Sequence, residues 1–248
     1  MMKSKIYSLI LGLFYFPVSV ATLHAQSEFA GQKTSLPESK IVKGADGKFS
    51  DKRDGKSYKT ITIGEQVWMA ENLDYQSKTG SWSYDNDPKN AKTYGRLYNW
   101  ETAKNVCPSG WHLPGDDEWK AMEIYLGMKP TQANVDRYRG TDQGGKLRST
   151  GTIEAGDGLW AAPNKLASNE SGFSAIPGGN LEADSTFLLK GHYGFWWTST
   201  ENSSRNAWYR FLSFMDPEVI RYPTSKNLGF SVRCVRDSSQ KTGQGSGK

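Results

Sequence analysis

Residues 106–122 read VCPSGWHLPGDDEWKAM and carry the strongest local structural signals in the chain. A proline and a glycine interrupt residues 106–113, which are therefore expected to be extended. A helix is predicted to begin directly after Pro114, with Gly115 as its N-cap.

The predicted helix has an apolar stripe and an acidic first turn. Trp119, Met122 and Leu126 lie at helical spacing and are expected to be buried, and Gly127 would end the helix. The acidic residues 116–118 (DDE) could be read as catalytic carboxylates. Because negative side chains stabilise the positive end of a helix, we interpret them as structural instead.

The segments before this stretch predict further elements. Residues 58–63 (YKTITI) and 66–70 (QVWMA) alternate around a Gly-Glu turn and predict a β-hairpin. Residues 94–104 (YGRLYNWETAK) place Leu97 and Trp100 at helical spacing, which predicts a short helix.

The segments after this stretch are dominated by short strands. Beyond residue 146 the apolar runs are brief and separated by Gly-rich loops, and the best candidates for strands are residues 172–176, 194–199, 207–213, 219–222 and 229–235. Two early helices followed by many short strands indicate an α+β fold.

Composition and charge exclude several classes of protein. The chain has 248 residues, of which 12% are aromatic, and its nine Trp all lie between Trp68 and Trp208, which argues against disorder. The net charge is +5, but residues 1–25 and the residues after Asp237 each contribute two lysines and no acid, so residues 26–237 carry only +1. A body so close to neutral lacks the electrostatic footprint of a nucleic-acid-binding protein.

Residues 1–25 have the pattern of a secretory signal peptide. The first five residues are positively charged, residues 6–20 are mainly apolar, and Ala25 is a small residue suited to cleavage. The apolar run is too short to span a bilayer comfortably, although an uncleaved membrane anchor is the alternative. No cysteine lies near residue 25, which excludes a lipid-modified N-terminal cysteine. We expect an exported protein, periplasmic or extracellular, whose mature chain has no transmembrane segment.

The rest of the chain divides into one body and two flexible ends. Residues 26–50 are polar and predict a linker, and residues 238–248 (SSQKTGQGSGK) predict a flexible tail. Residues 51–237 contain no Pro- or Gly-rich break long enough to separate domains. We therefore predict one domain over residues 51–237.

Cys107 and Cys234 are the two cysteines of the chain. An oxidising compartment favours a disulfide between them, which would close most of the body into one loop. The alternative is a free nucleophilic or redox cysteine, which needs an activating histidine. His112 and His192 are the histidines that remain after export.

Seven motifs follow one another along the body and together carry a family resemblance. They are residues 51–75 (DKRDGKSYKTITIGEQVWMAENLDY), 84–100 (YDNDPKNAKTYGRLYNW), 106–122 (VCPSGWHLPGDDEWKAM), 144–150 (GGKLRST), 171–179 (SGFSAIPGG), 194–201 (GFWWTSTE) and 227–237 (NLGFSVRCVRD). With these motifs, residues 51–237 resemble the Fibrobacter succinogenes major paralogous domain family, which is found in secreted and surface proteins of bacteria.

The resemblance implies a fold but no established activity. The family looks like a branch of the C-type-lectin-like fold, which would give an α+β domain with two helices, a twisted antiparallel sheet and long Gly-rich loops. The same fold contains the formylglycine-generating enzymes, which carry similar LP-x-x-x-E-W and GFR-C segments. The family itself is largely uncharacterised.

The chain departs from the family pattern at two positions. The family would place cysteines before Tyr84 and before Lys92, where this chain has Ser83 and Ala91. The joint loss suggests that the two cysteines form a disulfide elsewhere in the family, so residues 79–93 are expected to be more mobile here. The two cysteines of this chain match the remaining pair of the family.

The lectin-like resemblance suggests two kinds of cofactor chemistry. Calcium-dependent sugar binding in this fold uses a Glu-Pro-Asn loop and a Trp-Asn-Asp strand segment, and this sequence has neither. Asp85 and Asp87 offer oxygen ligands for calcium, but Asp-Asn-Asp-Pro is also an ordinary turn. Oxidation of a substrate cysteine, as in the formylglycine-generating relatives, needs a cysteine pair additional to Cys107 and Cys234. We therefore expect no enzyme, and calcium at Asp85 and Asp87 is the one cofactor that the sequence suggests.

Binding of a glycan or a surface protein is the function that the sequence favours. Sugars stack on aromatic rings while polar groups bond their hydroxyls. The predicted ligand-binding residues are one ring of a Trp-Trp pair and the polar loop that follows it: Trp197, Glu201, Asn202, Arg205 and Asn206. The alternative is a structural or adhesive surface module without a small-molecule site, in which both Trp rings serve the core. A formylglycine-generating-like enzyme is the least favoured reading.

Overall fold

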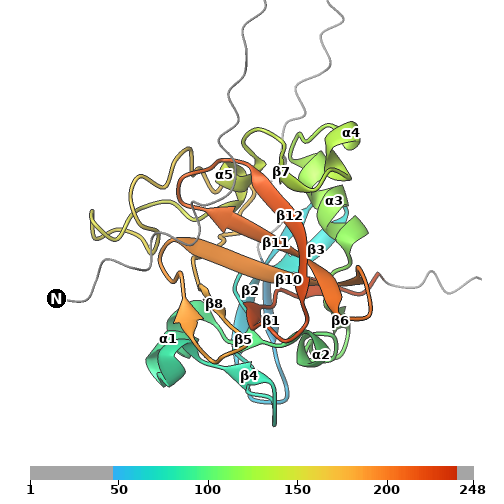
Figure 1. Ribbon diagram of the computed structural model, residues 1–248, viewed down its shortest axis with the longest axis vertical. Helices are drawn as coiled ribbons and strands as arrows, with labels where there is room; N and C mark the ends of the chain where they lie inside the picture. Colours follow the sequence, from blue (N-terminus) through green and yellow to red (C-terminus); the bar gives the residue numbers. More distant parts are fainter. Residues whose placement is uncertain (1–46, 239–248) are drawn as a thin grey trace, which may run out of the picture. The chain divides into compact units, whose positions relative to one another are not determined.

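The computed structural model describes residues 47–238, which begin with a three-stranded antiparallel unit (Figure 1). The predicted hairpin is confirmed, because β2 (Ser57–Ile63) pairs with β3 (Gln66–Met69). β1 (Gly47–Ser50) pairs with the other edge of β2, so the prediction that the linker reaches residue 50 is wrong. The predicted signal peptide, the linker up to residue 46 and residues 239–248 of the predicted tail lie outside the described residues.

The strands of the described region form three sheets. The five-stranded sheet has the order β1-β2-β3-β14-β6, in which β14 is Val235–Arg236 and β6 is Trp111–His112. The seven-stranded sheet has the order β4 (Ser81–Trp82), β5 (Leu97–Tyr98), β13 (Phe230–Ser231), β10 (Tyr193–Glu201), β11 (Asn206–Ser213), β12 (Val219–Ser225) and β7 (Arg137–Arg139). A small sheet joins β8 (Asn180–Leu181) to β9 (Phe187–Leu188).

The helices of the described region are short. They are the 3-10 helix η1 (Tyr84–Asn86), α1 (Pro88–Tyr94), α2 (Trp100–Ala103), α3 (Asp116–Tyr125), α4 (Pro130–Ala133) and α5 (Gln143–Leu147). The chain is therefore α+β, as predicted, with mostly antiparallel strands. The family resemblance implied two helices, whereas five short α-helices are present in residues 47–238.

The longest helix, α3, confirms the prediction made from its sequence. It begins at Asp116 with Gly115 as the N-cap residue, and Glu118 accepts a hydrogen bond from the Gly115 N–H. All three residues of the predicted apolar stripe are buried: Trp119, Met122 and Leu126.

The predicted helix over residues 94–104 is wrong. α1 ends at Tyr94 because Gly95 takes a φ of 75° and donates its N–H to the Ala91 carbonyl. The chain then forms β5, and a new helix starts only after Asn99, whose side chain accepts a hydrogen bond from the Thr102 N–H. Leu97 and Trp100 are therefore buried as parts of two different elements, β5 and α2, and their spacing resembles that of a single helix.

Two of the predicted strands are also corrected. Residues 172–176 form only an isolated bridge, because Gly172 and Ser174 both have positive φ angles that break an extended strand. Residues 229–235 contain two short strands in different sheets, β13 and β14. The predicted strands over residues 194–199, 207–213 and 219–222 are confirmed as β10, β11 and β12.

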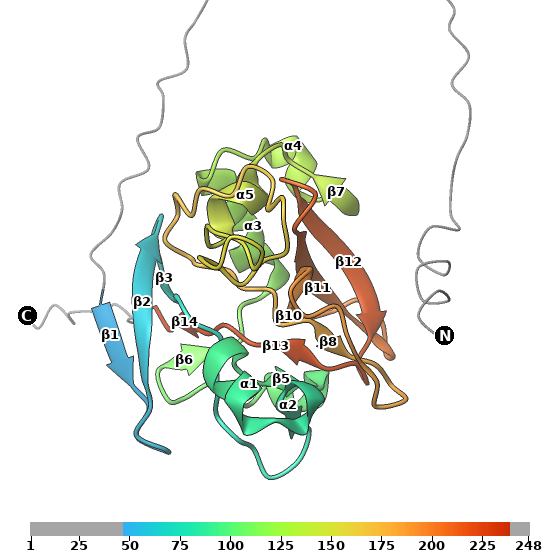
Figure 2. The same cartoon turned by 90° about the vertical axis from the view of Figure 1, so that its left-hand side faces the viewer.

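Two hydrophobic clusters fill the space around the sheets. Figure 2 shows the five-stranded and seven-stranded sheets on opposite sides, with α3 and α5 between their upper parts. In the first cluster, the Phe173 ring packs edge-on against Trp68, Trp119 and Trp196. In the second cluster, the Trp197 ring centroid lies 4.4 Å from that of Phe230. Neighbouring residues of β10 thus serve opposite clusters, as strand alternation requires.

A disulfide joins the two cysteines, as predicted. The Cys107 and Cys234 sulfurs are bonded, and the bridge links residues that are 127 positions apart. It ties the loop after α2 to the segment between β13 and β14. The described residues contain no helix that is long and apolar enough to cross a membrane.

Residues 79–93, predicted to be more mobile, form β4, η1 and the start of α1. Ser83 and Ala91, which replace the family's cysteines, are both buried. Asp87 caps α1 through the Lys89 N–H, and the Asn90 side chain donates to a backbone carbonyl of η1. These contacts hold the segment without a disulfide, and its greater mobility stays a prediction.

His112 joins three parts of the chain. Its Nδ1 lies 2.6 Å from an oxygen of Asp237, and its Nε2 lies 2.8 Å from an oxygen of Glu118. Partial burial lowers the pKa of His112, but hydrogen bonds to Asp237 and Glu118 and the charges of both outweigh burial and raise the pKa above its ordinary value of 6.5.

Replacing His112 by Gln should remove a pH-dependent contribution to stability. Because the pKa is raised in the folded chain, the protonated ring stabilises it fully below pH 6.5, and this contribution is lost as the pH rises through the folded-state pKa. The side chain is 41% exposed, so solvent screening limits the difference to about 1 kcal/mol or less. Urea unfolding of wild type and His112→Gln at about pH 6 and about pH 9 measures it. A stability difference that does not shrink at the higher pH would contradict this assignment.

Candidate functional site

Aromatic residues occupy alternate positions of two central strands. Tyr193, Phe195 and Trp197 do so in β10, and Tyr209 and Phe211 do so in β11. Successive side chains of a strand point to opposite faces, so each set lies on one face of its strand. The register places Phe195 opposite Phe211 and Trp197 opposite Tyr209, which puts both sets on the same face of the sheet.

The same face continues across the neighbouring strands. Tyr222 of β12 lies opposite Tyr209, and Tyr138 of β7 lies opposite Ile220. Tyr138 is 57% exposed and Tyr222 is 39% exposed, whereas Tyr209 is half-buried. We call this surface the aromatic face and define it by six residues: Tyr138, Tyr193, Phe195, Tyr209, Phe211 and Tyr222.

The rings of the aromatic face support one another. The centroids of Tyr193 and Phe195 are 6.0 Å apart and those of Tyr209 and Phe211 are 5.9 Å apart, both with stacked rings. Phe195 lies 5.5 Å from Phe211 and stacks at 5.1 Å on the buried Phe230 of the neighbouring strand β13. Rings held in this way lose little freedom when a ligand binds, which lowers the entropic cost of binding.

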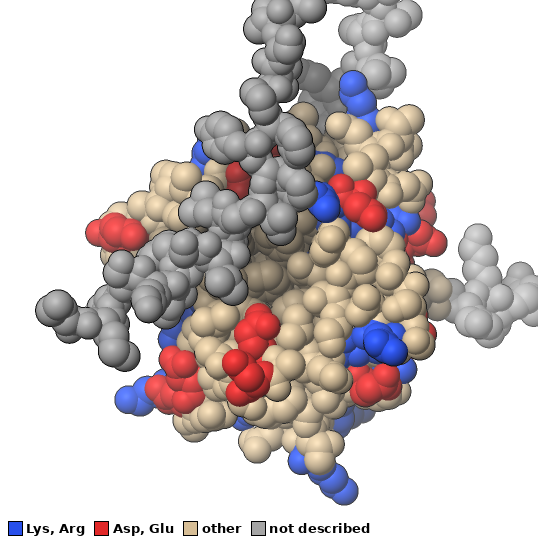
Figure 3. All heavy atoms as spheres, in the orientation of Figure 1, with Lys and Arg blue, Asp and Glu red and all other residues tan. Residues whose placement is uncertain are grey.

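The aromatic face lies in a hollow of the surface. Figure 1 shows the outer side of β10, β11 and β12. In the same orientation, Figure 3 shows a hollow over these strands that is lined by residues other than Lys, Arg, Asp and Glu. Acidic and basic side chains gather around its margin. A concave apolar floor with a polar margin is the usual form of a ligand-binding site.

Polar groups of the β8–β9 sheet lie near this floor. The Asn180 side-chain nitrogen donates to the Glu182 carboxylate at 2.5 Å, and Asn180 Oδ1 is buried without a hydrogen-bond partner among residues 47–238. The isolated bridge between Gly179 and Gly194 places the start of β8 beside β10. Burial raises the pKa of Tyr209, and the charges of Tyr222 and Glu182 raise it further. The half-buried Glu182 carboxylate is therefore the group of this pair that a ligand can reach.

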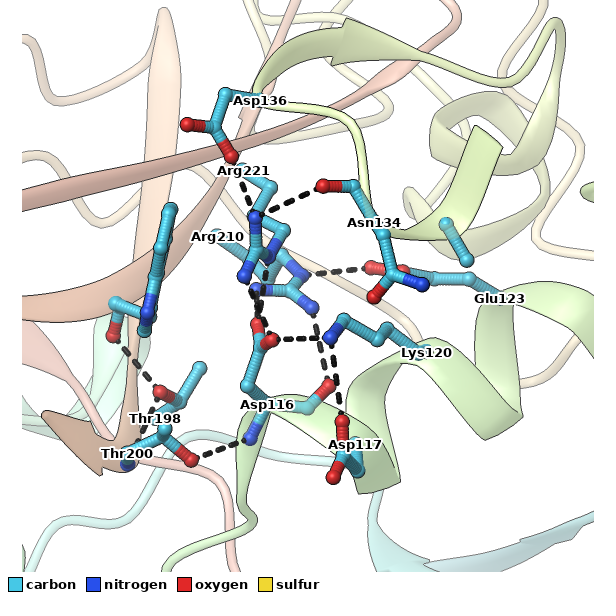
Figure 4. A network of polar contacts seen from close by, with 12 residues as sticks. Asp116, Asp117, Lys120, Glu123, Asn134, Asp136, Thr198, Thr200, Arg210 and Arg221 are labelled. Atoms are coloured by element: carbon cyan, nitrogen blue, oxygen red, sulfur yellow. Dashed lines mark hydrogen bonds and ion pairs between the residues drawn. The ribbon is translucent and has the colours of Figure 1, made fainter. Parts of the chain in front are cut away.

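The opposite face of the same strands is bound to α3 by a buried ion network (Figure 4). Asp116 accepts hydrogen bonds from Arg210 Nη1 at 2.7 Å and from Arg221 Nη2 at 2.8 Å. Glu123, two turns further along α3, accepts hydrogen bonds from Arg210 Nε at 2.8 Å and from Arg139 Nη1 at 2.6 Å. The network therefore connects α3 to β11, β12 and β7.

The network is closely balanced in charge. Its basic members are Lys120, Arg139, Arg210 and Arg221, and its acidic members are Asp116, Asp117, Glu123 and Asp136. Burial alone would raise the pKa of Asp116, but the hydrogen bond from Arg221 and the charge of Arg210 hold it well below its usual range. A carboxylate held ionised between two arginines serves to position the sheet, which agrees with the structural interpretation of residues 116–118.

The structure corrects the predicted role of Trp197 and keeps the polar loop at the surface. Trp197 has no exposed area, and its Nε1 donates to the Tyr98 carbonyl, so its ring cannot stack on a ligand. The other four predicted residues meet at the tip of the β10–β11 hairpin: Glu201, Asn202, Arg205 and Asn206. Of these, Glu201 already pairs with Lys226 at 3.1 Å.

The predicted calcium ligands do not form a metal centre in the described region. Asp87 caps α1 with its carboxylate, and Asp85 lies 4.0 Å from the Lys190 amine. Within residues 47–238, no group of three or more His, Cys, Asp or Glu side chains is arranged to hold a metal ion.

The sequence of β10 and β11 contains a signal for the aromatic face, although the sequence alone pointed to Trp197 and the polar loop. Aromatic residues at every second position of two adjacent strands indicate a continuous aromatic surface. Tyr138 and Tyr222 could not be added in this way, because only the register of β12 against β11 and β7 brings them to that surface.

Comparison with known proteins agrees with the motifs of the body. The model of the Fibrobacter succinogenes major domain matches residues 61–236, which include the disulfide, the ion network and the aromatic face. No curated protein and no solved structure matches the chain. The chain belongs to the Fibrobacter succinogenes major domain family.

Proposed function

We propose that the chain is an exported, non-enzymatic module that binds a glycan on the aromatic face. The observation that carries the proposal is a set of aromatic rings on one face of four strands, which includes the exposed Tyr138 and Tyr222. The outer side of three of these strands faces a hollow of the surface (Figure 3). Sugar rings present C–H groups that pack on aromatic faces, and their hydroxyls need donors and acceptors close by. The half-buried Glu182 carboxylate supplies such an acceptor.

Export and a lectin-like arrangement belong to the same proposal. The apolar segment that follows the basic residues at the start of the chain supports export, and the family disulfide is suited to an oxidising compartment. The α+β composition and the long loops between residues 148 and 193 support a C-type-lectin-like fold.

A glycan array tests the proposal, together with a variant of the two most exposed rings. We expect reproducible hits with wild type, and about thirtyfold weaker binding by Tyr138→Ala/Tyr222→Ala, because each of the two rings contributes of order 1 kcal/mol. Both residues are exposed at the surface, Tyr138 by 57% and Tyr222 by 39%, so the melting temperature of the variant should remain close to that of wild type.

The matched control is Ile124→Ala. Ile124 is 37% exposed and lies on α3, on the other side of the seven-stranded sheet, so its loss should leave binding unchanged. An empty array would contradict the glycan assignment and favour a structural or adhesive module. Binding that the double Tyr variant retains in full would place the ligand elsewhere.

A further inference from the structure

A groove lies between the β2–β3 hairpin, α1 and the loop around residues 159–176, away from the aromatic face. Its volume is about 690 Å³, which is within the range of small-molecule sites. Apolar groups line it at Leu159 and Ile176, and polar groups line it at Asn72 and Arg233. A second hollow of about 530 Å³ shares three of its residues and extends it along β2.

Arg233 brings a buried positive charge to this groove. Arg233 is only 1% exposed. Its guanidinium donates hydrogen bonds to Asn72 Oδ1 at 2.9 Å, to the Phe173 carbonyl, and to the Ser174 carbonyl at 2.8 Å. All three acceptors are neutral. An arginine has five N–H donors, so two of them have no acceptor among the described residues.

Burial has a measurable electrostatic effect on Arg233. Loss of solvent lowers the pKa of the guanidinium to about 9, and the more distant charge of Glu71 only partly offsets this. A buried charge without an opposite charge in contact is costly, and an anion that enters the groove would reduce that cost.

The other charges of the groove also favour an anion. Asp74 is already paired with Lys56 at 2.6 Å and with Arg96 at 3.2 Å. Lys59 and Lys92 line the groove, are exposed, and form no ion pair within the part of the chain that the structure describes.

We propose that this groove binds the carboxylate of a small organic acid, with Arg233 at its floor and Lys59 and Lys92 at its rim. A guanidinium binds a carboxylate through charge-assisted hydrogen bonds, and two N–H groups of Arg233 have no acceptor among the described residues. The carboxylates of Glu71 and Asp74 in the lining disfavour a doubly charged phosphate. The apolar wall suits the body of an acidic sugar or of a chain-terminal amino acid.

Titration of the full chain with matched pairs of ligands tests the proposal. The probes are glucuronate against glucose, and N-acetyl-leucine against N-acetyl-leucinamide, followed by calorimetry. We expect each acid to bind at least about tenfold more tightly than its neutral partner, because the charge-assisted hydrogen bonds are lost in the latter. The tighter of the two acids identifies the source of the carboxylate, an acidic sugar or a chain terminus.

Variants of the rim distinguish this groove from other surfaces. Lys59→Gln/Lys92→Gln should weaken binding of the acid about fivefold, since each exposed charge contributes about two- to threefold. Lys89→Gln is the matched control, because Lys89 is an exposed lysine of the same helix, α1, and is not part of the groove lining. Arg233→Gln should abolish binding of the acid. If that variant fails to fold, the loss of affinity in Lys59→Gln/Lys92→Gln still tests whether the acid binds in this groove.

Three outcomes would overturn the proposal. They are neutral partners that bind as tightly as the acids, inorganic phosphate that binds more tightly than either acid, and a rim variant that binds like the Lys89→Gln control.

Discussion

Asp116→Ala is expected to lower the free energy of unfolding by about 3–5 kcal/mol, because it removes the acid that neutralises two buried arginines. The Arg210 side chain has no exposure and that of Arg221 has 7%, so water cannot replace the lost carboxylate. The change also removes two hydrogen bonds from Arg221 and one from Arg210. In a chain of this size the melting temperature should fall by about 6–20 °C.

Asp117→Ala is the matched control for this prediction. Asp117 is the next residue of the same helical turn, but its side chain is 96% exposed and pairs only with Lys120. Its removal should cost about 0.5 kcal/mol or less. Urea unfolding of both variants measures the difference, and similar losses in the two would show that the network does not stabilise the fold.

The pH dependence of Asp116→Ala provides a second measurement. The pKa of Asp116 is lowered in the folded chain, so its contribution is present above the unfolded value of 3.8 and is lost as the pH falls through the folded value. The stability difference between wild type and Asp116→Ala should therefore narrow as the pH falls below 3.8.

Cys107→Ala/Cys234→Ala is expected to cost about 2–5 kcal/mol, because it releases a long loop in the unfolded chain. The two cysteines are 127 positions apart, so their bond restricts most of the domain before it folds. The melting temperature should fall by about 4–20 °C.

A reductant separates the effect of the bond from that of the substitutions. It should lower the melting temperature of wild type to near that of the double variant, and it should leave the double variant unchanged. A wild-type protein that is insensitive to full reduction would contradict a stabilising role for the disulfide.

Local signals predicted the elements whose stability comes from their own residues. The N-cap, the acidic first turn and the apolar stripe of α3 lie within about a dozen residues, and the helix forms where they indicate. The β2–β3 hairpin and the strands β10, β11 and β12 likewise follow from alternation between adjacent segments.

Local signals failed where distant segments decide the conformation. The apolar residues of 94–104 have helical spacing, but Leu97 pairs with Ser231 of β13 in a sheet. Trp100 instead lies in the second hydrophobic cluster. Residues 229–235 read as one strand, yet Phe230 pairs with Tyr98 and Val235 pairs with Trp68 of the other sheet. Such choices depend on partners more than 100 residues away, which a local pattern does not contain.

The candidate sites show the same division. The alternation of β10 and β11 already implies an aromatic surface, and the pairing of Cys107 with Cys234 follows from their number and the family pattern. By contrast, the burial of Trp197, the addition of Tyr138 and Tyr222, and the unpaired charge of Arg233 arise only when the sheets pack. The exposure of a side chain and the neutralisation of its charge depend on which elements pack around it. The local sequence therefore determines strands such as β10, β11 and β12, whereas tertiary packing determines which of their side chains can contact a ligand.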